Sequence, residues 1–280
     1  MTQEAESLAT VILTDWQPEA IAIALWIEVA YLLLVGPVRK RFRLGAPASA
    51  REVLWFSLAM VALILAEGSP IHVISERYLF GVHMLQHVLL TYVMPPLMIL
   101  GLPRWVYRPL LGRFLPVAKF LTHPLVAIVA FNASYTLWHL PELYEAALYN
   151  HNVHLLEHFV MVSTAFLMWW PLMSKVPELP RLHDAAQLLY VFFMSVAQIG
   201  VFGVVTFSSD VFYKFYAEAP RVWDISPMVD QQLAGIVMKL GGMFIFVYLL
   251  ARAFFRWAAS EEAAGNAAAR RPADGEKQGA

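Results

Sequence analysis

The histidines of this 280-residue chain are spaced in a way that can build a metal site. His83 and His87 are four residues apart, and so are His154 and His158, with His151 three residues earlier. In a helix this spacing puts each pair on one face, with about 40° between its members. A lone membrane histidine more often makes a polar contact between helices, but two such pairs at one depth favour ligation. Imidazole binds copper, zinc, iron and nickel, so the ligand type leaves the metal open.

Other polar residues extend this candidate set. His139 closes one predicted helix, and Asp230 begins another, where a carboxylate can bind a metal or orient a ligating imidazole. Asp230 can equally compensate the partial charge of its own helix N-terminus. Met84 and Met228 could add thioether donors for Cu(I), although a membrane methionine is usually packing filler. From the residues alone, seven histidines and Asp230 are candidates, and His72 and His151 are the weakest because loop histidines can simply be solvated. The seven histidines are His72, His83, His87, His139, His151, His154 and His158.

One short motif suggests a different chemistry. Residues His154–His158 read His-Leu-Leu-Glu-His, which matches the pattern of inverted zinc proteases. There both histidines would bind zinc and Glu157 would act as the general base. Five-residue patterns arise by chance in histidine-rich stretches, and no soluble catalytic domain surrounds this one. The chain has no cysteine, which excludes thiolate ligands and disulfides.

The elements that must position these residues are transmembrane helices. The chain is 59% hydrophobic and 15% charged, so it has more apolar and fewer charged residues than a typical soluble protein. A helix needs about 20 mainly apolar residues to cross the bilayer. Seven stretches qualify: Pro18–Val38, Val53–Glu67, Tyr78–Leu102, Pro124–Leu140, His154–Leu172, Ala185–Phe207 and Val229–Phe255. The predicted fold is therefore an all-α membrane protein, a bundle of about seven transmembrane helices. Bends are expected at Pro70 and at Pro95–Pro96.

The basic residues predict the orientation of this bundle. Sixteen of the 20 Lys and Arg residues lie in alternate loops or after the last span. The positive-inside rule then places the N-terminus outside, the C-terminus in the cytoplasm and the histidines on the outer side. The first 20 residues contain acidic but no basic residues, so we expect no cleavable signal peptide.

The span assignment also predicts the domain limits and one buried ion pair. Residues 1–257 form the transmembrane domain, and residues 258–280, rich in Ala, Gly, Glu and Arg, form a disordered cytoplasmic tail. Glu28 and Lys239 both lie near the middle of their spans. Because charges inside a membrane usually pair, we expect an ion pair between them.

Three sequence blocks, in order, resemble a known family. The first is His83–His87 followed by Pro95–Leu97, the second is Trp138–Pro141 followed by His154–His158, and the third is Asp230–Gly235. Together they resemble the CtaG family of multi-span cytochrome c oxidase assembly factors, over spans three to seven. The same name covers an unrelated single-span copper chaperone with a cysteine pair, which a cysteine-free chain cannot be.

The resemblance implies a function as well as a fold. It implies a protein of the bacterial inner membrane that binds copper at the outer face and delivers it to a haem-copper cytochrome c oxidase. It implies no enzymatic turnover and no nucleic-acid partner. The implied partners are the oxidase subunits, a periplasmic copper chaperone and the lipid bilayer. The implied metal positions are His83, His87, His139, His154, His158 and Asp230. Lys239 departs from the family pattern, where an apolar or aromatic residue is expected after Met238.

Two other functions are compatible with the residues. One is a seven-helix intramembrane zinc hydrolase, similar in outline to the alkaline ceramidases, with histidines and Asp230 around an activated water. The other is a membrane cytochrome, with haem held by histidines from spans three and five. Metal identity and a Soret band would separate these functions from copper delivery.

Overall fold

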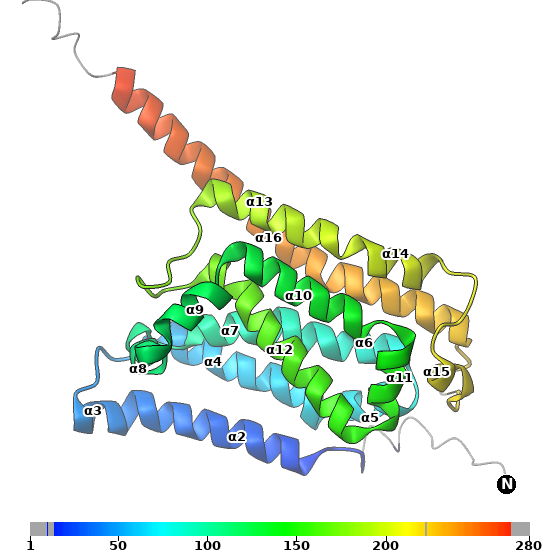
Figure 1. Ribbon diagram of the computed structural model, residues 1–280. Helices are drawn as coiled ribbons and strands as arrows, with labels where there is room; N and C mark the ends of the chain where they lie inside the picture. Colours follow the sequence, from blue (N-terminus) through cyan, green and yellow to red (C-terminus); the bar gives the residue numbers. More distant parts are fainter. Residues whose placement is uncertain (1–9, 11–13, 222, 270–280) are drawn as a thin grey trace, which may run out of the picture.

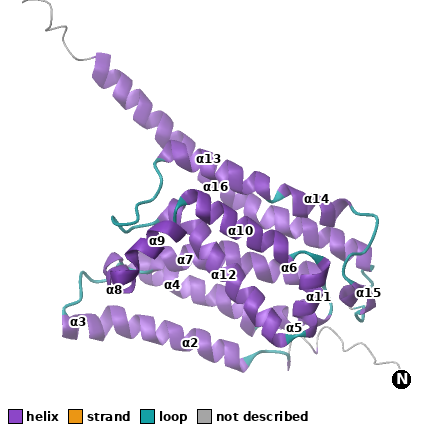
Figure 2. Ribbon diagram, in the orientation of Figure 1, coloured by secondary structure: helices purple, strands orange, loops and turns teal. Residues whose placement is uncertain are grey.

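The computed structural model describes residues 10, 14–221 and 223–269, and within them the protein is helical with no strand (Figure 2). Segments η1, η2 and η3 are π-helical, and η4 is a 3-10 turn. The elements follow in this order: α2 (Pro18–Leu33), η1 (Leu34–Val38), α3 (Arg39–Phe42), α4 (Ala50–Leu63), η2 (Ile64–Gly68), α5 (Pro70–Arg77), α6 (Phe80–Val88), η3 (Leu89–Val93), α7 (Met94–Gly101), α8 (Arg104–Leu111), η4 (Gly112–Phe114), α9 (Leu115–Leu121), α10 (Pro124–Trp138), α11 (Pro141–Tyr149), α12 (His151–Met173), α13 (Asp184–Ala197), α14 (Ile199–Phe207), α15 (Lys214–Glu218) and α16 (Pro227–Ala269).

Between five and seven of these helical stretches can span a membrane. Five are long and apolar enough by themselves: Pro18–Phe42, Phe80–Gly101, His151–Met173, Asp184–Phe207 and Pro227–Asn266. Two bent pairs add one span each if counted together: Ala50–Gly68 with Pro70–Arg77, and Gly112–Leu121 with Pro124–Trp138. Large apolar side chains are exposed on the outside of the bundle, as a lipid-facing surface requires. The predicted all-α membrane bundle is confirmed at this level.

Prolines shape the second and third spans in different ways. The predicted bend at Pro70 is present, with 42° between the two helices that meet there. In the third span the missing donor of Pro95 would leave the carbonyl of Thr91 without a partner. The indole of the buried Trp169 donates to that carbonyl at 2.8 Å, and the helix continues through the prolines as one span. The same bond ties α12 to the third span.

The bundle is organised around the third span and α16. Helix α16 packs against α6, α13 and α14, while α4 packs against α7 and α10 against α12 (Figure 1). The shared core contains Tyr92, Phe131, Trp169 and Phe246. Helices α4 and α7 come close because residue 101 is glycine: a Cβ there would lie 2.6 Å from the backbone nitrogen of Phe56.

The two ends of the bundle differ in composition. The short helices α5, α11 and α15 gather at one end, to the right in Figure 1, together with the first turns of α6 and α12. The short helices α3, α8 and α9 lie at the opposite end. That end carries the basic residues of α3 and α8, whereas the first end collects histidines and carboxylates.

Two sequence expectations differ from the structure. The ion pair between Glu28 and Lys239 is wrong: Glu28 accepts a hydrogen bond from Ser57 at 2.6 Å, and Lys239 lies 3.5 Å from the carbonyl of Ser195. The reason is packing, because α2 contacts α4 and η2 while α16 contacts α13 and α14. Helix α16 also continues to Ala269, into the stretch expected to be disordered, where alanine and glutamate favour helix. Residues 270–280 of that tail lie outside the described residues.

Candidate metal centre

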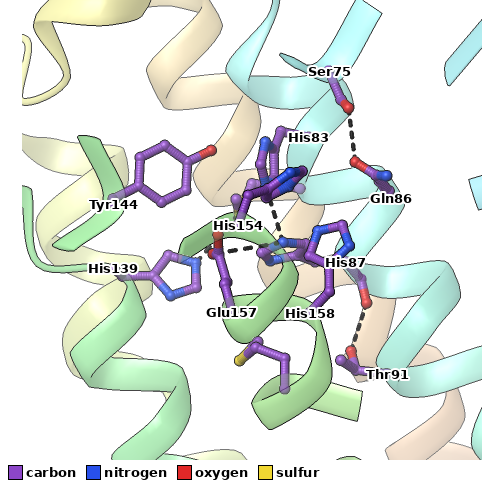
Figure 3. Close-up of polar contacts among 12 residues, drawn as sticks. Ser75, His83, Gln86, His87, Thr91, His139, Tyr144, His154, Glu157 and His158 are labelled. Atoms are coloured by element: carbon purple, nitrogen blue, oxygen red, sulfur yellow. Dashed lines mark hydrogen bonds and ion pairs between the residues drawn. The ribbon is translucent and has the colours of Figure 1, made fainter. Parts of the chain in front are cut away.

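Four histidines from two helices meet at the carboxylate-rich end of the bundle. His83 and His87 project from α6, and His154 and His158 project from α12 toward them (Figure 3). The ring centroids of His83 and His154 are 5.8 Å apart, and those of His87 and His158 are 5.4 Å apart. The two pairs that the sequence spacing put on single helix faces therefore lie opposite each other.

The donor atoms of this cluster are close enough to share one ion. Two groups of three residues have their ligand atoms within 4.8 Å of one another: His83 with His154 and His158, and His83 with His87 and Glu157. Several of these atoms are buried without a hydrogen-bond partner in the described part of the chain, namely Nε2 of His154 and His158, Nδ1 of His87 and both oxygens of Glu157. Buried polar atoms are normally hydrogen-bonded, so unpartnered donors that converge fit a metal ion.

Two carboxylates set the orientation of the α12 histidines. Nδ1 of His154 lies 2.9 Å from Glu76 Oε1, and Nδ1 of His158 lies 3.0 Å from Glu67 Oε1. A carboxylate accepts hydrogen bonds, so it places the imidazole proton on Nδ1 and leaves the Nε2 lone pair free. Carboxylate–histidine pairs of this kind hold the ligating histidines in many metal sites.

A tyrosine fixes the orientation and the tautomer of His83. Tyr216 donates its hydroxyl hydrogen to the carbonyl of Ser75 at 2.6 Å, so its oxygen accepts from its other neighbours. Those neighbours are Nδ1 of His83 at 3.1 Å and the hydroxyl of Tyr144 at 3.3 Å. Burial raises the pKa of Tyr144 and Tyr216 well above 10, so both hydroxyls keep their protons. The proton of His83 is thus on Nδ1, and its Nε2 accepts a hydrogen bond from Nε2 of His87 at 2.9 Å, a bond that a metal ion on this atom would replace.

A partly exposed rim separates the cluster from the surface. The side chains of Glu67 and Glu76 are 22% and 32% exposed, and His72 bridges them. Gln86 joins His72 to Ser75 behind this rim. Glu67 and Glu76 were not among the site residues expected from the sequence. Their signal was present, since acidic side chains at the end of an apolar span need partners.

His139 and Asp230 lie outside the two groups of ligand atoms. His139 donates from Nδ1 to the carbonyl of Tyr135 at 2.6 Å, and its Nε2 lies 3.3 Å from Met84 Sδ. Asp230 accepts the backbone N–H groups of Phe80 and Gly81 at 2.8 and 2.9 Å. Its carboxylate therefore caps the N-terminus of α6, and both of its oxygens are occupied. Of the six expected ligands, the structure brings four together.

Comparison with known proteins gives the family. The profile described as cytochrome c oxidase caa3 assembly factor (Caa3_CtaG) matches residues 29–260. The chain belongs to this family. It is a family of assembly factors and not of enzymes, and the match confirms the resemblance carried by the three sequence blocks.

Three mycobacterial proteins are similar in sequence to this chain. Uncharacterized proteins of Mycobacterium bovis and Mycobacterium tuberculosis are each 26% identical over 245 residues, which are 80% of this chain and 36% of theirs. One of Mycobacterium leprae is 24% identical over 264 residues, 85% of this chain and 39% of the relative. The chain thus spans little more than a third of the length of these relatives. No solved structure matches it.

Proposed function

We propose that this protein binds a copper ion between α6 and α12 and delivers it to a haem-copper cytochrome c oxidase during assembly. The family supports the assembly role. The observation that carries the copper site is the convergence of Nε2 of His154 and His158, both buried and unpartnered, on the imidazole of His83. Copper is here the cargo, so its site must bind it and also release it.

The donor set suits this cargo. Copper stands at the top of the affinity order for divalent ions at nitrogen sites, and Cu(I) also accepts imidazole and thioether ligands. His139 and Met84, 3.3 Å apart, offer one donor of each kind beside the cluster. A site made largely of neutral imidazoles can exchange ligands one at a time, which a transfer protein needs.

We propose that the centre faces the outer side of the bacterial inner membrane. The basic residues of α3 and α8 lie at the opposite end of the bundle, and such residues favour the cytoplasm. The N-terminus would then be outside and the C-terminus inside. The negative rim of Glu67 and Glu76 would attract cations from the periplasm, where a copper chaperone would supply them.

The test is metal content and visible spectrum of the purified full chain, compared with two variants. We expect about one copper per chain with no Soret band, because the centre offers imidazoles to a single small ion. His83→Ala should lose the copper, whereas His151→Ala, which changes an exposed histidine of the same end, should keep it. Zinc in place of copper would support a hydrolase, a Soret band would support a cytochrome, and a chain without copper after loading would refute the proposal.

A further inference from the structure

We propose that the centre contains a second, deeper position for the cation, formed by His83, His87 and Glu157, and that one ion occupies the two positions in turn. This inference rests on the proposed copper function and adds a path within it. The outer position is the group of His83, His154 and His158.

Glu157 is the clearest sign of the inner position. Its side chain is 0% exposed, and neither carboxylate oxygen has a hydrogen-bond partner within the described residues. Oε1 lies 3.7 Å from Nε2 of His87, whose Nδ1 is also buried and unpartnered. A buried carboxylate without a partner is costly, and a cation between it and two imidazoles would remove that cost.

The shared residue makes the two positions mutually exclusive. Nδ1 of His83 is held by Tyr216, so only Nε2 can bind an ion in either group, and the ion would replace the 2.9 Å hydrogen bond between this atom and Nε2 of His87. One nitrogen lone pair binds one ion, so the centre holds a single ion in one place or the other. In the step between them the bond to His83 persists, the bonds to His154 and His158 break, and bonds to His87 and Glu157 form. The ion keeps its charge, because no electron is exchanged.

The surroundings of the two positions give the path a direction. The outer histidines bond to the partly exposed carboxylates Glu76 and Glu67, so the ion arrives there. The ring of His87 lies 6.4 Å from that of His139, which also forms part of the wall of a 470 Å³ apolar cavity beside α10 and α14. The ion therefore leaves the centre past His139, on the side of this cavity.

Removing each position separately tests this inference. The outer variant is His154→Ala/His158→Ala, the inner variant is His87→Ala/Glu157→Gln, and the exposed control is His151→Ala. Three quantities are measured for each full-length protein. They are the copper content per chain, the number of nitrogen and oxygen ligands from X-ray absorption, and the rate of Cu(I) transfer to an apolar chelator dissolved in the detergent micelle. We expect each double variant to keep about one copper, the outer one with affinity weakened about 10–100-fold. The inner variant should transfer copper at least about tenfold more slowly than the wild type.

Several outcomes would overturn the inference. Two coppers bound at once would show that the positions are not exclusive. Complete loss of copper in the outer variant, with wild-type copper content and transfer rate in the inner variant, would show that there is no inner position. If His87→Ala impairs folding, Glu157→Gln alone keeps the side-chain shape, and an unchanged transfer rate in it would also refute the inference. Failure of the wild type to bind copper would instead refute the proposed function.

Discussion

The carboxylate of Glu76 offers a clean test of how the rim supports the centre. It accepts the Nδ1 hydrogen of His154 at 2.9 Å. In Glu76→Gln the amide oxygen can still accept this hydrogen, so the ring orientation and the tautomer are kept while the negative charge is lost. The substitution therefore isolates the electrostatic contribution of the carboxylate to copper affinity.

The size of this contribution follows from the geometry. With a metal–nitrogen bond of about 2 Å, an ion on Nε2 of His154 lies about 7 Å from the Glu76 carboxylate. At an effective dielectric constant of about 20 a unit positive charge at that distance gains about 2.4 kcal/mol, and at about 40 it gains about 1.2 kcal/mol. Because the Glu76 side chain is 32% exposed, its attraction for the ion lies between these two values. Glu76→Gln should then weaken Cu(I) binding between about 8-fold and about 50-fold.

Competition with a chromophoric Cu(I) chelator measures this change. Glu67→Gln should weaken binding at least as much as Glu76→Gln, because the Glu67 side chain is less exposed and is held against His158. The control is Glu142→Gln, an exposed glutamate in the first turn of α11, which should leave the affinity unchanged. Wild-type affinity in both rim variants would refute the assignment of these carboxylates as supports of the ligating imidazoles.

Three further predictions concern stability, each read from thermal or denaturant unfolding in detergent. Asp230→Ala should lower the free energy of unfolding by about 2 kcal/mol, because it removes the cap of α6. The variant should keep its copper. Loss of copper without loss of stability would make Asp230 a ligand. Gly101→Ala should lower the free energy of unfolding by about 1–3 kcal/mol, because the new Cβ would clash with the Phe56 backbone. An unchanged unfolding midpoint would contradict the close packing of α4 and α7. Burial raises the pKa of Tyr107 above its usual value near 10. The unfolded chain ionises first, so stability is complete below about pH 10 and falls above it, and Tyr107→Phe should reduce that fall.

The membrane-spanning helices and the two histidine pairs of the centre were predictable from the sequence. Hydropathy and length identify the spans, and the spacing of His83 with His87 and of His154 with His158 fixes their faces, because both signals are local. The meeting of the two pairs depended on which helices are neighbours, which the family resemblance implied but no local signal contains.

The parts that were missed depend on contacts between distant segments. Glu67 and Glu76 orient histidines far along the chain, and Tyr216 reaches His83 from another short helix. Asp230 was expected at the metal because a carboxylate can serve either as a ligand or as a cap. Its bonds to the start of α6, about 150 residues away, show that it caps this helix, and its role as a ligand stays a prediction. The predicted pairing of Glu28 with Lys239 was wrong for a similar reason, since equal depth in the membrane does not make two helices neighbours.

The π-helical segment Leu89–Val93 makes the centre tolerant of one change in chain length. A π turn holds about one more residue than an α-helical turn, and one residue of an α-helix corresponds to about 100° of rotation. The extra residue is taken up within the π turn, so a deletion of one residue within 89–93 would convert it to an α-helical turn and leave His83 and His87 facing α12. The same deletion in the α-helical stretch between His83 and His87 would change their spacing and separate the pair. An alignment gap at 89–93 in a relative would therefore mark loss of the π turn and not loss of the centre.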